Sequence, residues 1–179
     1  MDNANVHGVD EMIKRLNQAK LYIKEDVPEV IGTEAVRHFK KGFADEGFTD
    51  KSLKKWASRK TKVTHGRGPL RGGDAEGLED SIVFKVEGNT ITIYSDKVYG
   101  QIHNEGGTIE VTPGMKAHFW KEYYAAKETG EAELMEQWKA MALAKKITIP
   151  QRQFIGESQV LIETITAKVL RDLTQILNS

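Results

Sequence analysis

The sequence contains no cysteine, which excludes several classes of protein at once. A disulfide-stabilised scaffold, a thiolate nucleophile and a zinc site with sulfur ligands all require this residue. A chain without thiols fits a reducing compartment such as the cytosol.

An excess of charge of one sign is also missing. The chain has 26 basic and 26 acidic residues, so its formal net charge is zero. It therefore lacks the overall basic field that would point to nucleic acid as a partner. No apolar run is long enough to span a bilayer, and the first residues lack the basic and apolar regions of a secretory signal.

The composition is that of an ordinary globular protein. Of its 179 residues, 39% are hydrophobic and 29% are charged, which is enough apolar material for a core. This length favours a single domain over residues 1–179. Within it we predict a basic mobile loop at 51–76 and a helical insertion at 113–145.

A predicted β-hairpin organises the rest of the chain. Residues 82–87 and 90–95 alternate apolar and polar side chains on either side of Gly88–Asn89, which predicts a type II′ turn. The register set by this turn pairs Val86 with Ile91, Phe84 with Ile93 and Ile82 with Ser95. The apolar residues then share one face, and that face needs a cover.

We predict an α+β fold with an antiparallel sheet of about four strands. The third strand contains Ile109 and Val111, and residues 146–149 form the fourth. Long N- and C-terminal helices cover the sheet, and we expect the C-terminal stripe (Ile162, Ile165, Val169 and Leu173) to contact the hairpin. The N-terminal stripe is interpreted as core packing; it consists of Val9, Met12, Ile13, Leu16 and Ile23.

Turn-forming residues predict where shorter elements begin and end. Pro28 should break or bend the N-terminal helical region, and Asp26 should cap the helix that follows. Asp96 should cap a short helical turn in which Val98, Tyr99 and Ile102 point inward. Gly106 and Gly107 should allow the chain to reverse after it.

A helical flap is predicted before the last strand. Gly130 separates two groups of apolar and aromatic residues, which indicates two helices. The flap has more aromatic and methionine side chains than it can bury alone, so it packs either on its own domain or on a neighbouring subunit. Its candidate partner-binding residues are Trp120, Tyr123, Tyr124 and Trp138.

The second candidate partner-binding surface is the basic segment from residue 51 to residue 72, which has no acidic residue. Trp56 is expected to insert at the edge of the core, and the glycines and Pro69 that follow disfavour regular structure. The segment fits an anionic partner, either nucleic acid or the acidic face of a protein ring, or is a solvated loop. Its candidate residues are Lys54, Lys55, Arg59, Lys60, Lys62, Arg67 and Arg71.

His103, next to Asn104 and Glu105, is the residue that invites an enzymatic interpretation. The chain lacks the helical histidine spacing of metal sites and a serine in a glycine elbow. We therefore interpret His103 as structural, bonding the backbone at a turn. We expect Arg152 to reach a carbonyl or a carboxylate. No catalytic residue, metal ligand or cofactor is predicted.

Three motifs follow one another along the chain: Gly77-Leu78-x-x-Ser81-Ile82, Tyr99-Gly100-x-Ile102-His103-Asn104-x-Gly106 and Ile149-Pro150-x-Arg152-x-Phe154-Ile155-Gly156. In this order they resemble the phage virion morphogenesis family, the Mu-like G and P2-like S tail completion proteins. The resemblance covers most of the chain from Pro28 onward. The chain departs from the family pattern at Gly100, where alanine is usual, and at Gln151 and Gln153, where small and proline residues are usual.

The resemblance implies a structural role in tail completion or head–tail joining during assembly of a tailed phage. It implies neck or tail proteins as partners, a homo-oligomeric ring in the virion, and the host cytoplasm as the place of assembly. The free chain can be a monomer, and no membrane is implied. Two alternatives remain open: a nucleic-acid-binding protein that uses residues 51–71, and a hydrolase centred on His103.

Overall fold

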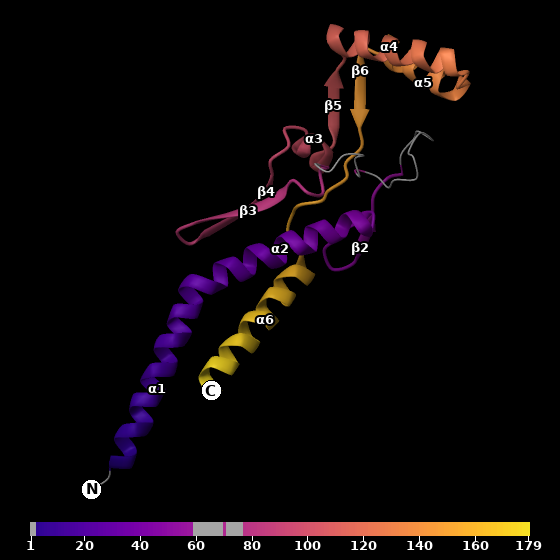
Figure 1. Ribbon diagram of the computed structural model, residues 1–179. Helices are drawn as coiled ribbons and strands as arrows, with labels where there is room; N and C mark the ends of the chain where they lie inside the picture. Colours follow the sequence, from indigo (N-terminus) through magenta and orange to yellow (C-terminus); the bar gives the residue numbers. More distant parts are fainter. Residues whose placement is uncertain (1–2, 59–69, 71–76) are drawn as a thin grey trace.

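The computed structural model describes residues 3–58, 70 and 77–179. The fold is α+β, and the strands within these residues form three separate two-stranded antiparallel sheets. Figure 1 shows the long N-terminal helices with the C-terminal helix beside them, and a helical hairpin held away from both. The predicted sheet of about four strands is therefore wrong.

The N-terminal region is helical throughout its described length. Helix α1 (Asn3–Leu21) continues through a π-helical turn, η1 (Tyr22–Asp26), into α2 (Val27–Ala44). Pro28 lies in the first turn of α2, where its missing N–H needs no helical partner, so the chain bends at η1 instead of breaking (Figure 1). Asp26 makes no side-chain capping hydrogen bond, because the helical backbone runs through it, and that prediction is wrong.

The central hairpin forms as predicted. Strand β3 (Ile82–Glu87) pairs with β4 (Thr90–Ser95), and Ile82 faces Ser95, Phe84 faces Ile93 and Val86 faces Ile91. Gly88 has φ of +61°, the positive value that the first position of a type II′ turn requires. A second, shorter pair consists of β1 (Gly47–Thr49) and β2 (Leu53–Lys55).

The other two predicted strands pair with each other. Strand β5 (Gly107–Glu110) lies antiparallel to β6 (Lys146–Ile149). Between them the chain forms α4 (Pro113–Thr129) and α5 (Ala132–Leu143), and Gly130 ends α4 with a left-handed φ of +76°. Strand β5 leads into this helical insertion and β6 follows it. The two strands therefore pair as a ribbon at the base of the insertion.

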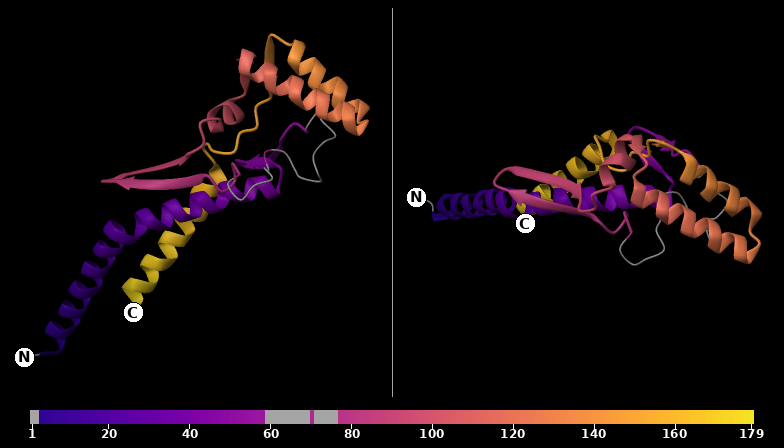
Figure 2. Two further views of the ribbon diagram at one scale, coloured as in Figure 1. Left: turned by 45° about the horizontal axis from the view of Figure 1, so that its top comes forward. Right: turned by 90° about the horizontal axis from the view of Figure 1, so that it is seen from above.

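Helix α2, and not the C-terminal helix α6 (Gln159–Asn178), covers the hairpin. The ring of Phe84 lies directly on Gly32 of α2, where any side chain would collide with it. The hairpin and α6 lie along different sides of α2 (Figures 1 and 2). The prediction that the α6 stripe covers the hairpin is therefore wrong: Ile165 packs at the edge of the core, but Ile162 is exposed.

The buried core lies around the C-terminal half of α2. The ring of Phe43, which is completely buried, lies 5.3 Å from the ring of Trp56 and 5.6 Å from that of Phe154. Trp56 enters this core as predicted. The other buried members are Ala35, Phe39, Phe48, Leu78, Ile82 and Leu161.

Polar contacts between side chains also join the N-terminal helices to α6. The buried carboxylate of Glu34 pairs with Arg37 and accepts a hydrogen bond of 2.9 Å from Lys168. That hydrogen bond and the neighbouring cations hold the pKa of Glu34 below its usual value, against the opposing effect of burial. Tyr22 in η1 donates to Asp172 at 3.0 Å. Among the described residues, no helix has the length and apolar character to cross a membrane.

Candidate functional site

The three sequence motifs, which are far apart along the chain, meet at one place that we call the motif junction. It consists of residues 77–82, helix α3 (Gly100–Glu105) with its flanking residues 99 and 106, and residues 149–156. A Cβ added at Gly100 would lie 2.9 Å from the Oγ of Ser95 and 3.7 Å from Leu78. Alanine, which is usual here in the resembled family, would require Ser95 to shift.

Asn104 holds the third motif against α3. Its Oδ1 accepts hydrogen bonds from the backbone N–H groups of Phe154 at 2.8 Å and Ile155 at 2.9 Å. The carbonyl of His103 accepts a third bond, from the backbone N–H of Arg152, at 2.8 Å. One short helix therefore positions the whole segment between β6 and α6.

Arg152 connects the junction to the start of the basic segment. Its buried guanidinium donates to the carbonyl of Ala57 at 2.9 Å and to that of Ser58 at 3.3 Å. The indole N–H of Trp56 donates in return to the carbonyl of Gln153 at 2.7 Å. The predicted contact of Arg152 with a carbonyl is confirmed.

His103 lies on α3 with its ring edge-on to that of Tyr99, the two centroids being 6.0 Å apart. Within residues 3–58, 70 and 77–179, no group of three His, Cys, Asp or Glu side chains is placed to hold a metal ion. As predicted, φ is positive at Gly106 and Gly107. Hydrogen bonds that involve backbone carbonyl and amide groups join α3 to residues 149–156 in this junction.

The turn before α3 differs from the prediction. The helix begins at Gly100, not near Asp96, because the Ser95 hydroxyl accepts a hydrogen bond from the N–H of Lys97 at 3.2 Å and forms a local turn first. Val98 is consequently 99% exposed and Tyr99 is 44% exposed, so the expectation that they point inward is wrong.

Only part of the predicted basic surface lies in the described chain. Lys54 and Lys55 are exposed on β2, and Lys55 bonds the carbonyl of Asp45 at 2.6 Å. Five candidates lie outside the described residues, as does most of the predicted mobile loop: Arg59, Lys60, Lys62, Arg67 and Arg71.

The flap, residues 113–143, stands away from the core on the β5–β6 ribbon, as Figure 2 shows from two further directions. Its aromatic candidates separate into two groups. Trp138 stacks on buried Phe119 at 5.9 Å and so belongs to the contact between α4 and α5. Trp120, Tyr123 and Tyr124 contact one another at 5.2–6.3 Å, and Tyr124 is 57% exposed. We call these three residues the outer aromatic cluster.

A second exposed apolar surface was not predicted. We call α1 together with residues 170–178 of α6 the stalk, which extends from the core at the end opposite the flap (Figure 1). The N-terminal stripe, interpreted above as core, is more than half exposed at each of its five positions: Val9, Met12, Ile13, Leu16 and Ile23. That interpretation is wrong: α6 contacts α1 and Ala19 is buried, but these five side chains remain largely in solvent.

Comparison with known proteins adds no relative: the chain matches no protein-family model, no curated protein and no solved structure.

Proposed function

We propose that this chain is a structural phage morphogenesis protein that acts in tail completion or head–tail joining through contacts between subunits. The observation that carries the proposal is the pair of exposed apolar surfaces, on the stalk and on the flap, at opposite ends of a small core. Contiguous exposed apolar surface of this kind marks sites of protein–protein contact.

The shape of the chain supports the same proposal. Its accessible surface is 12409 Å², whereas a compact protein of 20.1 kDa has roughly 8,700 Å². A chain that leaves so much surface exposed gains stability when neighbouring subunits cover it.

The hydrogen bonds of the motif junction support a structural role for the residues that carry the family resemblance. Arg152 and Asn104 direct their side chains at backbone groups of the same chain. In this proposal neither residue meets a substrate or a cofactor. The partners are neck or tail proteins and further copies of the chain, in the virion and in the host cytoplasm during assembly.

Electron microscopy of particles made without this chain tests the proposal. The gene is deleted from the phage or prophage genome that carries it, and the lysate is compared with one in which the chain is supplied in trans. We expect heads and tails that are separate or incomplete without the chain, and joined particles when it is supplied. Normal virions from the deletion would overturn the proposal, and salt-dependent DNA binding by the purified chain would favour the nucleic-acid alternative.

A further inference from the structure

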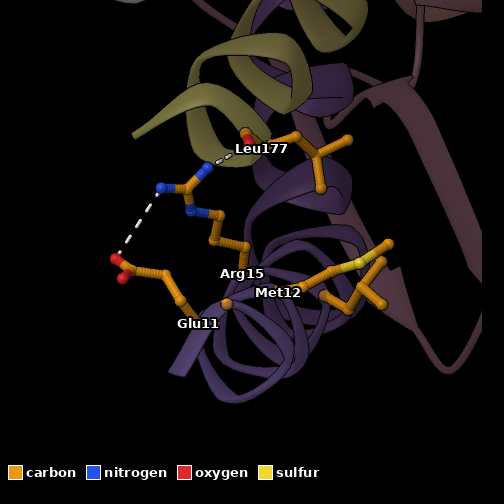
Figure 3. A pocket seen from close by; sticks show the side chains of 6 residues that line it. Glu11, Met12, Arg15 and Leu177 are labelled. Atoms are coloured by element: carbon orange, nitrogen blue, oxygen red, sulfur yellow. Dashed lines mark hydrogen bonds and ion pairs between the residues drawn. The ribbon is translucent and has the colours of Figure 1, made fainter. Parts of the chain in front are cut away.

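The stalk contains a groove whose apolar wall is uncovered. The groove has a volume of about 580 Å³, and its lining residues are Gly8, Glu11, Met12, Arg15, Leu16 and Leu177. Figure 3 shows Met12 and Leu177 on one side, with Arg15 and Glu11 on the other. Arg15 donates to the carbonyl of Leu177 at 3.1 Å and pairs with Glu11 at 3.7 Å. The two terminal nitrogens of Arg15 are thus paired within the chain, whereas the apolar wall is open to a partner.

The apolar residues of the stalk have the spacing of a coiled-coil seam. Val9, Met12, Leu16, Ala19 and, just beyond α1, Ile23 lie alternately three and four residues apart. Ala19 is already buried within the chain, so the exposed part of this seam is Val9, Met12, Leu16 and Ile23. The positions that border this seam include Arg15 and Lys20. In a parallel pair of stalks, Arg15 of one copy would face Lys20 of the other, and like charges at these positions oppose pairing. The seam therefore fits an acidic helical partner better than a second stalk.

The tip of the flap has the complementary charge. Residues 127–136, at the turn between α4 and α5, contain four glutamates (Glu128, Glu131, Glu133 and Glu136) and a single base, Lys127. Residues 14–24, in α1 and η1, contain four bases (Lys14, Arg15, Lys20 and Lys24) and no acid. Arg15 and Lys24 pair with Glu11 and Glu25 just outside this range, which leaves Lys14 and Lys20 as the bases that the contact would use. All four glutamates are exposed, and Tyr124 and half-buried Leu134 add apolar surface nearby.

We propose that the stalk groove of one copy binds the flap tip of a second copy of this chain. The stalk and the flap lie at opposite ends of the molecule, so a copy cannot fill its own groove (Figure 1). Two unlike surfaces that bind each other produce a head-to-tail contact, which closes into a ring when the rotation allows it. This inference rests on the proposed function, because a ring at the tail or neck needs such a contact.

Cysteine cross-linking between two variants of the full chain tests the contact directly. Because the natural sequence has no cysteine, each introduced thiol is the only one in its chain. Met12→Cys places a thiol in the groove and Tyr124→Cys places one on the flap. The matched control is Val98→Cys, whose position is 99% exposed and belongs to neither surface. Thermal unfolding of each variant checks that it is folded.

We expect the mixture of the groove and flap variants to form a disulfide-linked heterodimer at least about tenfold faster than the mixture of the groove and control variants. Added salt should slow this reaction, because it screens the charges. Changing Lys14 and Lys20 to Glu should slow it as well, and changing Glu128 and Glu131 to Lys in the partner should restore the rate.

A heterodimer that forms no faster than the control overturns the inference. Dominant cross-linking of the groove variant to itself also overturns it, since that would show pairing between two stalks. The reaction uses purified chain alone, whereas the proposed function is tested on particles. Failed cross-linking with normal dependence of particle assembly on the chain would therefore remove this inference and leave the proposed function in place.

Discussion

In the motif junction, polar side chains are buried and bond the backbone, whereas in the flap large aromatic side chains lie partly in solvent and contact one another. Arg152 is 8% exposed and donates to carbonyls of Ala57 and Ser58. Tyr124 is 57% exposed and its ring lies 5.2 Å from that of Tyr123.

This difference separates residues that stabilise the fold, in the junction, from residues whose exposed surface is available to a partner, in the flap. A buried guanidinium that is removed leaves its acceptors unsatisfied, so changes in the junction should destabilise the fold. An exposed aromatic or aliphatic side chain contributes little to the isolated chain, and its burial against a partner contributes to binding instead. Changes in the flap and the stalk should therefore affect association more than folding.

The largest loss of stability is expected in the core beside the junction. Replacing Phe43, which is fully buried, with alanine should cost about 3–5 kcal/mol, because it leaves a cavity between two other rings. Phe84→Ala, on the half-buried face of the hairpin, should cost less. Equal losses at the two positions in denaturant unfolding would show that the hairpin is as buried as the core.

A smaller loss is expected at Arg152. Arg152→Ala removes the hydrogen bonds to the carbonyls of Ala57 and Ser58 and should cost about 1.5–3 kcal/mol. Arg152→Lys keeps the charge but not the planar guanidinium with its several N–H donors. It should therefore be more stable than the alanine variant but less stable than the natural chain. The midpoint of unfolding measures both, and an unchanged midpoint in the alanine variant would contradict the role of Arg152 in the junction.

Acid should weaken the contact between α2 and α6. The pKa of Glu34 is lowered in the folded chain, chiefly by the hydrogen bond from Lys168. Its contribution is therefore present above the unfolded-state pKa of about 4.3 and is lost as pH falls through the lower folded-state value. Glu34→Gln and Lys168→Met should each flatten the fall in melting temperature below about pH 5. A fall as steep as that of the natural chain would refute this link.

The smallest effect on folding is expected in the stalk. Met12 and Leu16 are 63% and 51% exposed, so changing both to serine should cost less than about 1 kcal/mol in dilute solution. If the stripe were core, the same change would cost several times as much. Unfolding at low protein concentration separates the two cases, and the cross-linking described above measures the loss of association.

Local patterns predicted the hairpin and the flap, because each depends on residues close in sequence. Gly88–Asn89 and the alternation around it are enough to specify the β3–β4 register, and Gly130 marks the end of α4. Arg152 was also expected to bond a carbonyl. The spacing of these residues did not indicate that Asn104 would hold Phe154 and Ile155, since that contact crosses some fifty positions of the chain.

The packing of elements that are far apart in the sequence could not be predicted from such local patterns. An apolar stripe shows that a helix face avoids water, but not which surface covers it. The stripe of α1 has the same periodicity as a core helix, although its residues are exposed. The proposed contact with a second copy is inferred from the seam spacing of α1 and from the bases at 14–24. Likewise, β5 and β6 have ordinary strand patterns, and only the closure of the insertion between them decides that they pair.

The claim that the flap and the stalk serve assembly, and the core serves stability, is tested most directly by infectious titre. A lysate that lacks the chain is supplied with purified protein, either the natural chain, the Val98→Ser control, or the double variant with Trp120 and Tyr124 changed to serine. We predict that the natural chain and the control restore the titre, and that the folded double variant does not. Full restoration by the double variant would contradict the claim that the outer aromatic cluster is a docking surface.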